Sequence, residues 1–256
     1  MSINNYLTVH LNYLINNIAQ NQCNVKLIDK PAASYRDFSA STCDVNCIHV
    51  QINNLKNIVD EIHDAISDTS WIDKLDALSQ EIFRATSERT INKVVNEIIA
   101  GVTSTVNEDI GEYIVSYAGQ SVLETNFSHK KIPLAELLKE KVSGNPGFDF
   151  HTISTKRFLV FGEAKFSMSG TPRAIALDQI GEFISLKKEM AELQTFRPFM
   201  DDECEKNILA GMRGYAAAFS FNAKDIDAIF KNALESDIID ELIKHNELYL
   251  IAVEIC

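Results

Sequence analysis

The chain has 256 residues, of which 46% are hydrophobic and 23% are charged. This composition is that of a globular protein with a substantial core, and it excludes a mainly disordered, collagen-like or disulfide-framework protein. No apolar run approaches the length of a membrane span, and the first residues lack the basic start of a secretory signal. Five cysteines, an odd number, predict reduced thiols and a cytoplasmic location.

Charge is unevenly distributed along the chain. The net charge is −12, yet residues 126–190 contain ten Lys or Arg and seven Asp or Glu, a local net of +3. The overall acidity disfavours non-specific nucleic-acid binding by the isolated chain. The central excess has two open interpretations: a basic groove on an acidic body, or ordinary variation of surface charge.

The N-terminal part of the chain is predicted to be mainly helical. Residues 6–18 mix apolar residues with asparagine and fit either a strand or a short helix, and residues 47–50 predict a short strand. From Leu55 to Ile99 apolar residues recur at helical spacing, with an interruption at 68–70. The inward face of the second segment is expected to hold Ile72, Leu75, Leu78, Ile82 and Phe83.

Three further helical segments are expected before the middle of the chain. Ser87 is a predicted N-cap for a helix that Gly101 ends. A helix from about Asn107 to Tyr117 is expected to end at Gly119, and residues 133–141 predict a short amphipathic helix.

The pattern changes at the turn cluster of residues 143–147, after which strands alternate with helices. Thr171 and Pro172 predict a helix start, and Asn222 predicts another. The predicted elements are strands at 148–153, 158–166, 214–221 and 248–255, with helices from Pro172 to about Leu193 and after Asn222. This order predicts an α/β fold in which helices pack on a mixed sheet. We divide the chain into a mainly helical accessory or partner-binding region, 1–104, and a core, 105–256.

The tripeptide Glu163-Ala164-Lys165 is the most informative motif for chemistry. On a strand, residues two apart face the same side, so Glu163 and Lys165 are expected to project together from an otherwise apolar segment. Asp149 lies on the preceding strand of the predicted hairpin. Two carboxylates can hold Mg²⁺ or Mn²⁺, and a nearby lysine can position water and offset negative charge, which is what metal-assisted phosphodiester cleavage requires.

The surrounding residues extend this motif into a family resemblance. Glu112 on a predicted helix, Asp149 at a strand end, Glu163-x-Lys165 on the next strand and Gln179 on the next helix resemble the PD-(D/E)xK nuclease superfamily. Gln179 with Phe183 four residues later is similar to the Gln-xxx-Tyr motif of the RecB-like branch, with phenylalanine in place of tyrosine. Phe148 also stands where the superfamily name has proline. More narrowly, residues 147–149 and 162–166 behind a helical region resemble the HamA family, the nuclease subunits of Hachiman antiphage defence systems.

The resemblance implies a restriction-endonuclease-like core and a role for each matching residue. Asp149 and Glu163 would be metal ligands, Lys165 the catalytic lysine and Glu112 an additional ligand. Gln179 would orient a phosphate or the lysine. The HamA-like features further imply a superfamily-2 helicase partner (HamB-like) that delivers DNA for cleavage.

Each of these assignments has a simpler alternative. Glu163 and Lys165 would also fit a solvated ion pair on an edge strand, and Asp149 would fit a turn residue after Gly147. Glu108 shares the helix face of Glu112, and Gln179 is an ordinary residue of a helix surface. The alternatives for the whole chain are a non-catalytic α/β interaction protein and a nuclease that acts on RNA.

Other motifs in the sequence give weaker evidence for a functional site. His151 is two residues from Asp149, where either a site role or a hydrogen-bonded structural role is expected. Cys43, Cys47 and His49, with Cys23 upstream, match no established zinc spacing. The sequence contains no P-loop, dinucleotide-binding or Gly-x-Ser-x-Gly motif, which disfavours nucleotide hydrolysis and serine hydrolase chemistry. Basic residues that are candidate phosphate contacts are Lys130, Lys131, Lys156, Arg157, Arg173, Lys187 and Lys188.

Overall fold

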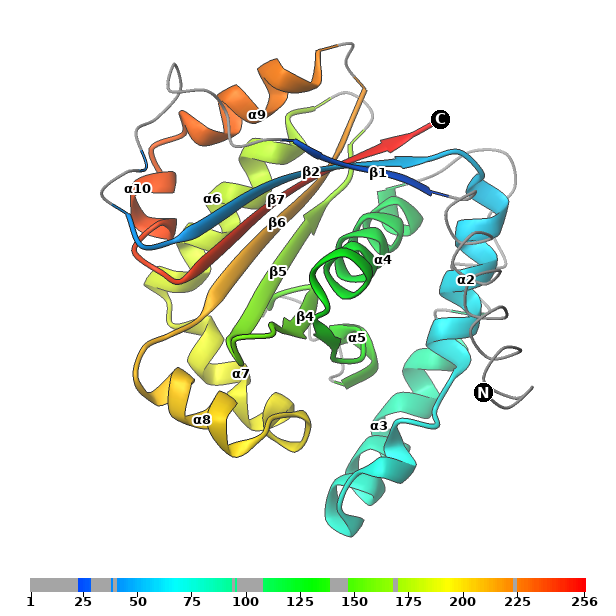
Figure 1. Cartoon of the computed structure of the whole chain (residues 1–256). Helices are drawn as coiled ribbons and strands as arrows, with labels where there is room; N and C mark the ends of the chain where they lie inside the picture. Colours follow the sequence, from blue (N-terminus) through cyan, green and yellow to red (C-terminus); the bar gives the residue numbers. More distant parts are fainter. Residues whose placement is uncertain are drawn as a thin grey trace, which may run out of the picture.

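A mixed, seven-stranded sheet with helices on both faces forms the body of the protein (Figure 1). The structure is a computed structural model and describes residues 23–28, 38, 41–93, 95, 108–138, 147–167, 170–222 and 225–256. The strands are β1 (Cys23–Ile28), β2 (Asp44–Ile52), β3 (Lys130–Lys131), β4 (Phe150–Ile153), β5 (Leu159–Lys165), β6 (Gly214–Phe221) and β7 (Glu247–Ile255). The helices are α2 (Leu55–Ser67), α3 (Ala77–Lys93), α4 (Glu108–Phe127), α5 (Ala135–Leu138), α6 (Pro172–Ser185), α7 (Lys188–Phe196), α8 (Asp202–Leu209), α9 (Ile226–Leu234) and α10 (Ile239–Leu242), with 3-10 turns η1 (Ile72–Lys74) and η3 (Arg197–Phe199).

Four parallel strands form the centre of the sheet. The strand order is β1-β2-β7-β6-β5-β4-β3, and β2, β7, β6 and β5 run in the same direction. The outer pairings, β1 with β2, β4 with β5 and β3 with β4, are antiparallel. Because β2 pairs with β7 from Asp44 opposite Glu247 to Ile52 opposite Ile255, the sheet continues across the boundary predicted at residue 104. The described part of 1–104 therefore supplies strands as well as helices.

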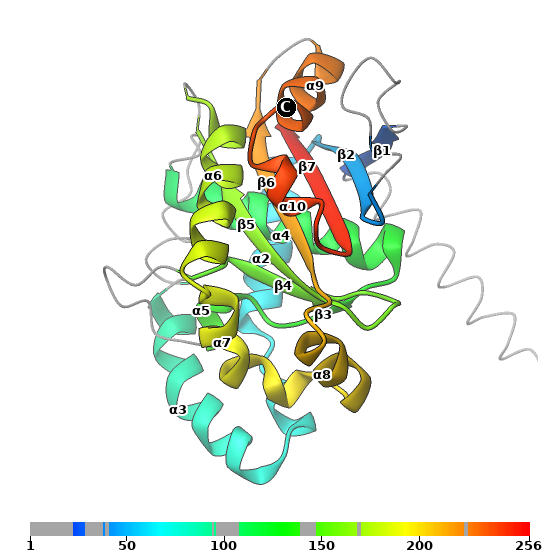
Figure 2. The same ribbon diagram turned by 90° about the vertical axis from the view of Figure 1, so that its left-hand side faces the viewer.

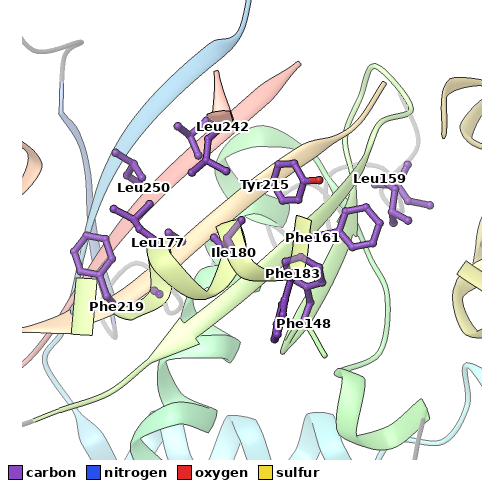
Figure 3. Close-up of a cluster of buried hydrophobic side chains, with 14 of the residues drawn as sticks. Phe148, Leu159, Phe161, Leu177, Ile180, Phe183, Tyr215, Phe219, Leu242 and Leu250 are labelled. Carbon is purple, nitrogen blue, oxygen red and sulfur yellow. The ribbon is translucent and has the colours of Figure 1, made fainter. Parts of the chain in front are cut away.

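Each face of the sheet has its own apolar core. Figure 2 shows α6, α9 and α10 in front of the strands, with α2 and α4 behind them. The first core contains buried side chains of α6, such as Leu177, Ile180 and Phe183, packed on β5 and β6 (Figure 3). The second joins Ile58 and Ile62 of α2 to residues of α4 and the opposite face of the strands. Burial on both faces explains why the central strands are nearly continuous apolar runs.

The helix predicted to end at Gly119 instead continues to Phe127 as α4. A glycine normally weakens a helix interior, but here it permits close packing. A Cβ atom added at Gly119 would lie 3.0 Å from the ring of Phe150 and 3.1 Å from Ala218. The glycine therefore lets α4 lie close against the sheet rather than ending the helix.

Two predictions about α3 are wrong. Ser87 is not an N-cap, since it lies within α3 and its hydroxyl donates to the carbonyl oxygen of Leu137 at 2.7 Å. Ile72 and Phe83 are buried as predicted, but Leu78 and Ile82 are 71% and 51% exposed. The inward face of α3 is thus narrower than the apolar pattern suggests.

Two helix boundaries in the C-terminal half also differ from prediction. The helix expected to reach Leu193 breaks into α6 and α7 at Lys187, whose backbone is left-handed with φ 53°. Asp225, rather than Asn222, caps α9 by accepting the N–H of Ala228 at 3.0 Å. The strands predicted near 47–50, 148–153, 158–166, 214–221 and 248–255 are all confirmed, whereas residues 6–18 and Gly101 lie outside the described residues. None of the helices in the described ranges combines the length and apolar character that a membrane crossing demands.

Candidate active site at the carboxyl end of β5

Glu163 and Lys165 project from a central strand, not from an edge. β5 lies between β4 and β6, and Glu163 is opposite Ala217 in the register with β6. The Glu163 side chain is fully buried, and that of Lys165 is 16% exposed. The alternative of a solvated edge-strand pair is therefore wrong.

The β4–β5 pairing brings Asp149 next to these two residues. Asp149 lies at the bend before β4, where its backbone N–H donates to the carbonyl oxygen of Gly162 at 2.9 Å. Its carboxylate Oδ2 accepts the backbone N–H of Ala164 at 2.8 Å. This hydrogen bond holds the carboxylate beside Glu163 and Lys165.

Three carboxylates surround the ammonium group of Lys165. Its Nζ lies 2.7 Å from Glu163 Oε1, 3.6 Å from Glu112 Oε1 and 4.0 Å from Asp149 Oδ2. Glu112 comes from α4, on the other side of the strand, and its side chain is 38% exposed. Four of the five predicted site residues thus meet at the carboxyl end of β5, in a group that we call the Lys165 cluster: Glu112, Asp149, Glu163 and Lys165.

Two contacts that the sequence analysis missed set the position of Glu112 and of the chain after β5. A Cβ atom added at Gly111 would lie 2.2 Å from the ring of Phe166, so the absence of a side chain lets α4 approach the end of β5. Ser220 on β6 holds the next residue, because its Oγ accepts the backbone N–H of Ser167 at 3.0 Å. A glycine inside a predicted helix, directly before Glu112, was the available signal for the first contact.

Burial and charge act strongly on the cluster. Burial, together with the nearby charge of Asp149, raises the pKa of Glu163 well above its ordinary value of 4.5, although Lys165 opposes the shift. Burial lowers the pKa of Lys165, but the carboxylates of Glu163, Asp149 and Glu112 outweigh it and hold that pKa above its ordinary value. Three carboxyl groups and one ammonium are thus crowded in a poorly solvated place, where the raised pKa of Glu163 favours its neutral form.

The donor set fits a divalent cation. Among the described residues, no backbone N–H donates to the carboxylate of Glu163, which interacts instead with the Lys165 ammonium and with the carboxyl group of Asp149. Buried carboxylate oxygens of this kind suit a hard cation such as Mg²⁺. As the side chains stand, the described part of the chain contains no group of three or more His, Cys, Asp or Glu arranged to hold a metal ion. The ammonium of Lys165 lies among the carboxylates instead.

Gln179 and His151 are not part of the Lys165 cluster. Gln179 is half-buried on α6, and no hydrogen bond within the described residues joins it to Lys165 or to the carboxylates. Its role stays a prediction. His151 is fully buried against α7, with its ring centre 3.8 Å from that of Phe196 and its Nε2 3.4 Å from Glu192.

The cysteines near β2 do not form a zinc site in the described residues. Cys43 and Cys47 are buried, and burial raises the pKa of the Cys47 thiol to about 12, which disfavours the thiolate that zinc binds. His49 pairs instead with Glu254, at 3.0 Å. The side chain of Cys23 lies outside the described residues.

In comparisons with known proteins, no family model, no curated protein and no solved structure matches this chain.

Proposed function

We propose that this chain is a metal-dependent nuclease that hydrolyses phosphodiester bonds in DNA and acts with a helicase subunit in antiphage defence. The observation that carries the proposal is the meeting of Asp149, Glu163 and Lys165 at the carboxyl end of β5. In sheets with parallel strands, this edge is where ligands usually bind. The resemblance to the PD-(D/E)xK superfamily adds the expectation of a restriction-endonuclease-like core.

The residues of the Lys165 cluster would share the chemistry as follows. Asp149 and Glu163 would hold Mg²⁺ or Mn²⁺, with Glu112 as an additional ligand. When bound, such an ion polarises a phosphoryl oxygen and lowers the pKa of coordinated water. The Lys165 ammonium, which the neighbouring carboxylates keep protonated despite its burial, would stabilise negative charge developing on the phosphate.

Net charge supports the need for a partner. A chain with a net charge of −12 repels the nucleic-acid backbone over most of its surface, so weak, salt-sensitive DNA binding is expected of the isolated protein. A superfamily-2 helicase subunit that brings DNA to the Lys165 cluster would overcome this repulsion. Tight, salt-insensitive binding by the chain alone would contradict this part of the proposal.

Cleavage assays with matched variants test the proposal. Linear and plasmid DNA, and an RNA of the same sequence, would be incubated with Mg²⁺ or Mn²⁺, with and without a candidate superfamily-2 helicase subunit. Glu163→Gln and Lys165→Met should abolish cleavage while the proteins remain folded. Glu124→Gln is the control, since Glu124 forms a half-exposed ion pair with Lys131 away from the cluster. Equal behaviour of all variants would favour the non-catalytic alternative, and preference for the RNA would change the substrate.

A further inference from the structure

Chain topology separates the candidate phosphate contacts into two groups. Lys130 and Lys131 lie on β3 opposite the end of β4, and Lys156 and Arg157 lie in the β4–β5 hairpin. Because β4 runs antiparallel to β5, all four are at the opposite end of the sheet from Lys165. Among the described basic residues of 126–190, Lys165 and Arg173 are the two at its carboxyl end.

The course of α6 establishes the position of Arg173. Figure 3 shows Leu177 beside Phe219, which is the register partner of Lys165, and Phe183 beside Phe161 nearer the start of β5. The helix therefore begins at the carboxyl end of β5 and runs back along the sheet. Arg173 is the second residue of α6, so it lies at the same edge as the Lys165 cluster.

Arg173 is held in place but has no acidic partner among the described residues. Its Nη1 donates to the carbonyl oxygen of Ile229 in α9 at 3.2 Å, and the side chain is half-buried. Burial lowers the pKa of its guanidinium group. By contrast, Lys156 pairs with Asp44, and Arg157 pairs with Asp201 at 3.3 Å.

We infer that Arg173 binds a backbone phosphate that flanks the scissile one, so that the substrate strand crosses the carboxyl edge of the sheet from the Lys165 cluster towards α9. This inference rests on the proposed function. A guanidinium fixed through one nitrogen keeps further donors in a planar fork, which matches two phosphate oxygens. A desolvated cation without an acidic partner gains most from such a contact. Arg173 is thus a substrate-binding residue, distinct from the residues that would perform hydrolysis.

Oligonucleotide binding tests this inference separately from cleavage. Fluorescence anisotropy of a labelled single-stranded oligonucleotide would be measured over a range of salt in the Glu163→Gln background, where cleavage is blocked. Arg173→Gln removes the charge but keeps a donor for Ile229, and Arg157→Gln is the matched control. We expect Arg173→Gln to weaken binding about tenfold and to reduce the salt slope by roughly 0.7, with no change for the control. Equal affinity and equal slope for both variants would overturn the inference.

A second measurement does not depend on the folding of an Arg173 variant. Phenylglyoxal modifies accessible arginines, and mass spectrometry locates the modified residues. Saturating oligonucleotide should slow modification of Arg173 in the otherwise unmutated Glu163→Gln protein and leave Arg157 unaffected. Failure to protect Arg173 would overturn the inference, whatever the stability of the substitutions.

The two proposals fail in different ways. If the wild-type protein cleaves nucleic acid and Arg173→Gln binds and cleaves like the wild type, the nuclease proposal stands and the Arg173 inference falls. If the wild type does not cleave with its partner and metal, yet Arg173→Gln weakens binding, the nuclease proposal falls and the phosphate contact stands. If no variant loses activity or binding, both proposals are refuted.

Discussion

Replacing Glu163 with glutamine should make the protein more stable and inactive at the same time. The carboxylate is fully buried, and no backbone N–H of the described residues donates to it. Lys165 at 2.7 Å compensates only part of the burial, since the pKa of Glu163 is still raised. In the substituted protein Lys165 would keep Glu112 and Asp149 as partners, so no isolated charge is created.

The pH dependence of the effect follows from the direction of that pKa shift. A carboxyl group whose pKa is raised in the folded protein favours folding fully below its unfolded pKa, and this contribution is lost as pH rises through the folded value. Glu163→Gln should therefore match the wild type in stability well below pH 4.5 and exceed it above that value. At pH 7 to 8 the expected gain in unfolding free energy is about 1–3 kcal/mol. This corresponds to a rise of several degrees in Tm, roughly 2–4 °C per kcal/mol.

Urea unfolding at pH 4 and pH 8, paired with the DNA cleavage assay, would test this reasoning. If the Glu163 carboxylate serves function and destabilises the fold, Glu163→Gln should lose activity and gain stability at pH 8. Lower stability of Glu163→Gln at pH 8 would refute it. That result would mean that Glu163 and Lys165 form a structural ion pair, as the non-catalytic alternative requires.

Three further changes test other parts of the structure. Lys165→Met should abolish cleavage and lower the free energy of unfolding by about 2–4 kcal/mol at pH 8, because the buried carboxylates lose their cation. Lys165→Arg should restore most of the stability. An unchanged unfolding midpoint for Lys165→Met would contradict this account. Gly111→Ala should lower the free energy of unfolding by about 1–3 kcal/mol, because the new Cβ atom would lie 2.2 Å from the Phe166 ring. If Gly111→Ala and Phe166→Ala have additive effects in a double-mutant cycle, the contact between these residues is unimportant. Burial lowers the pKa of His129 from 6.5 to about 4, so between these pH values the unfolded chain binds a proton that the folded protein does not. The free energy of unfolding should therefore fall by up to about 3 kcal/mol as the pH drops from 6.5 towards 4. His129→Gln should flatten that fall in urea titrations, and a wild-type slope in this variant would exclude His129 as its source.

Sequence patterns predicted the sheet well because its strands are short apolar runs bounded by turn signals. Residues 158–166 and 248–255 have no other way to bury so many apolar side chains between two layers of helices. Helix boundaries were less predictable, because tertiary contacts decide them. At Gly119 the local signal indicates a helix end, yet packing against Phe150 and Ala218 favours continuation.

Proximity within the site was predictable for the residues on paired strands. The hairpin between 148–153 and 158–166, in the register that pairs Phe150 with Gly162, brings Asp149 next to Glu163. The position of Glu112 was not predictable from spacing alone, since it depends on how closely α4 approaches β5. That approach is set by the contact between Gly111 and Phe166, which are far apart in the sequence.

Two buried charge groups in this protein differ in a way that bears on function. On the α7 side of the sheet, Arg213 pairs with Glu189 at 2.9 Å, and the charge of the buried Glu192 also acts on Glu189. At the end of β5 a single ammonium faces three carboxylates, two of them nearly or fully buried. An imbalance of this kind destabilises a folded chain unless a cation from outside compensates it. Under the proposed function, a bound metal ion would supply that cation at the carboxyl end of the parallel strands, so the imbalance would serve binding rather than stability.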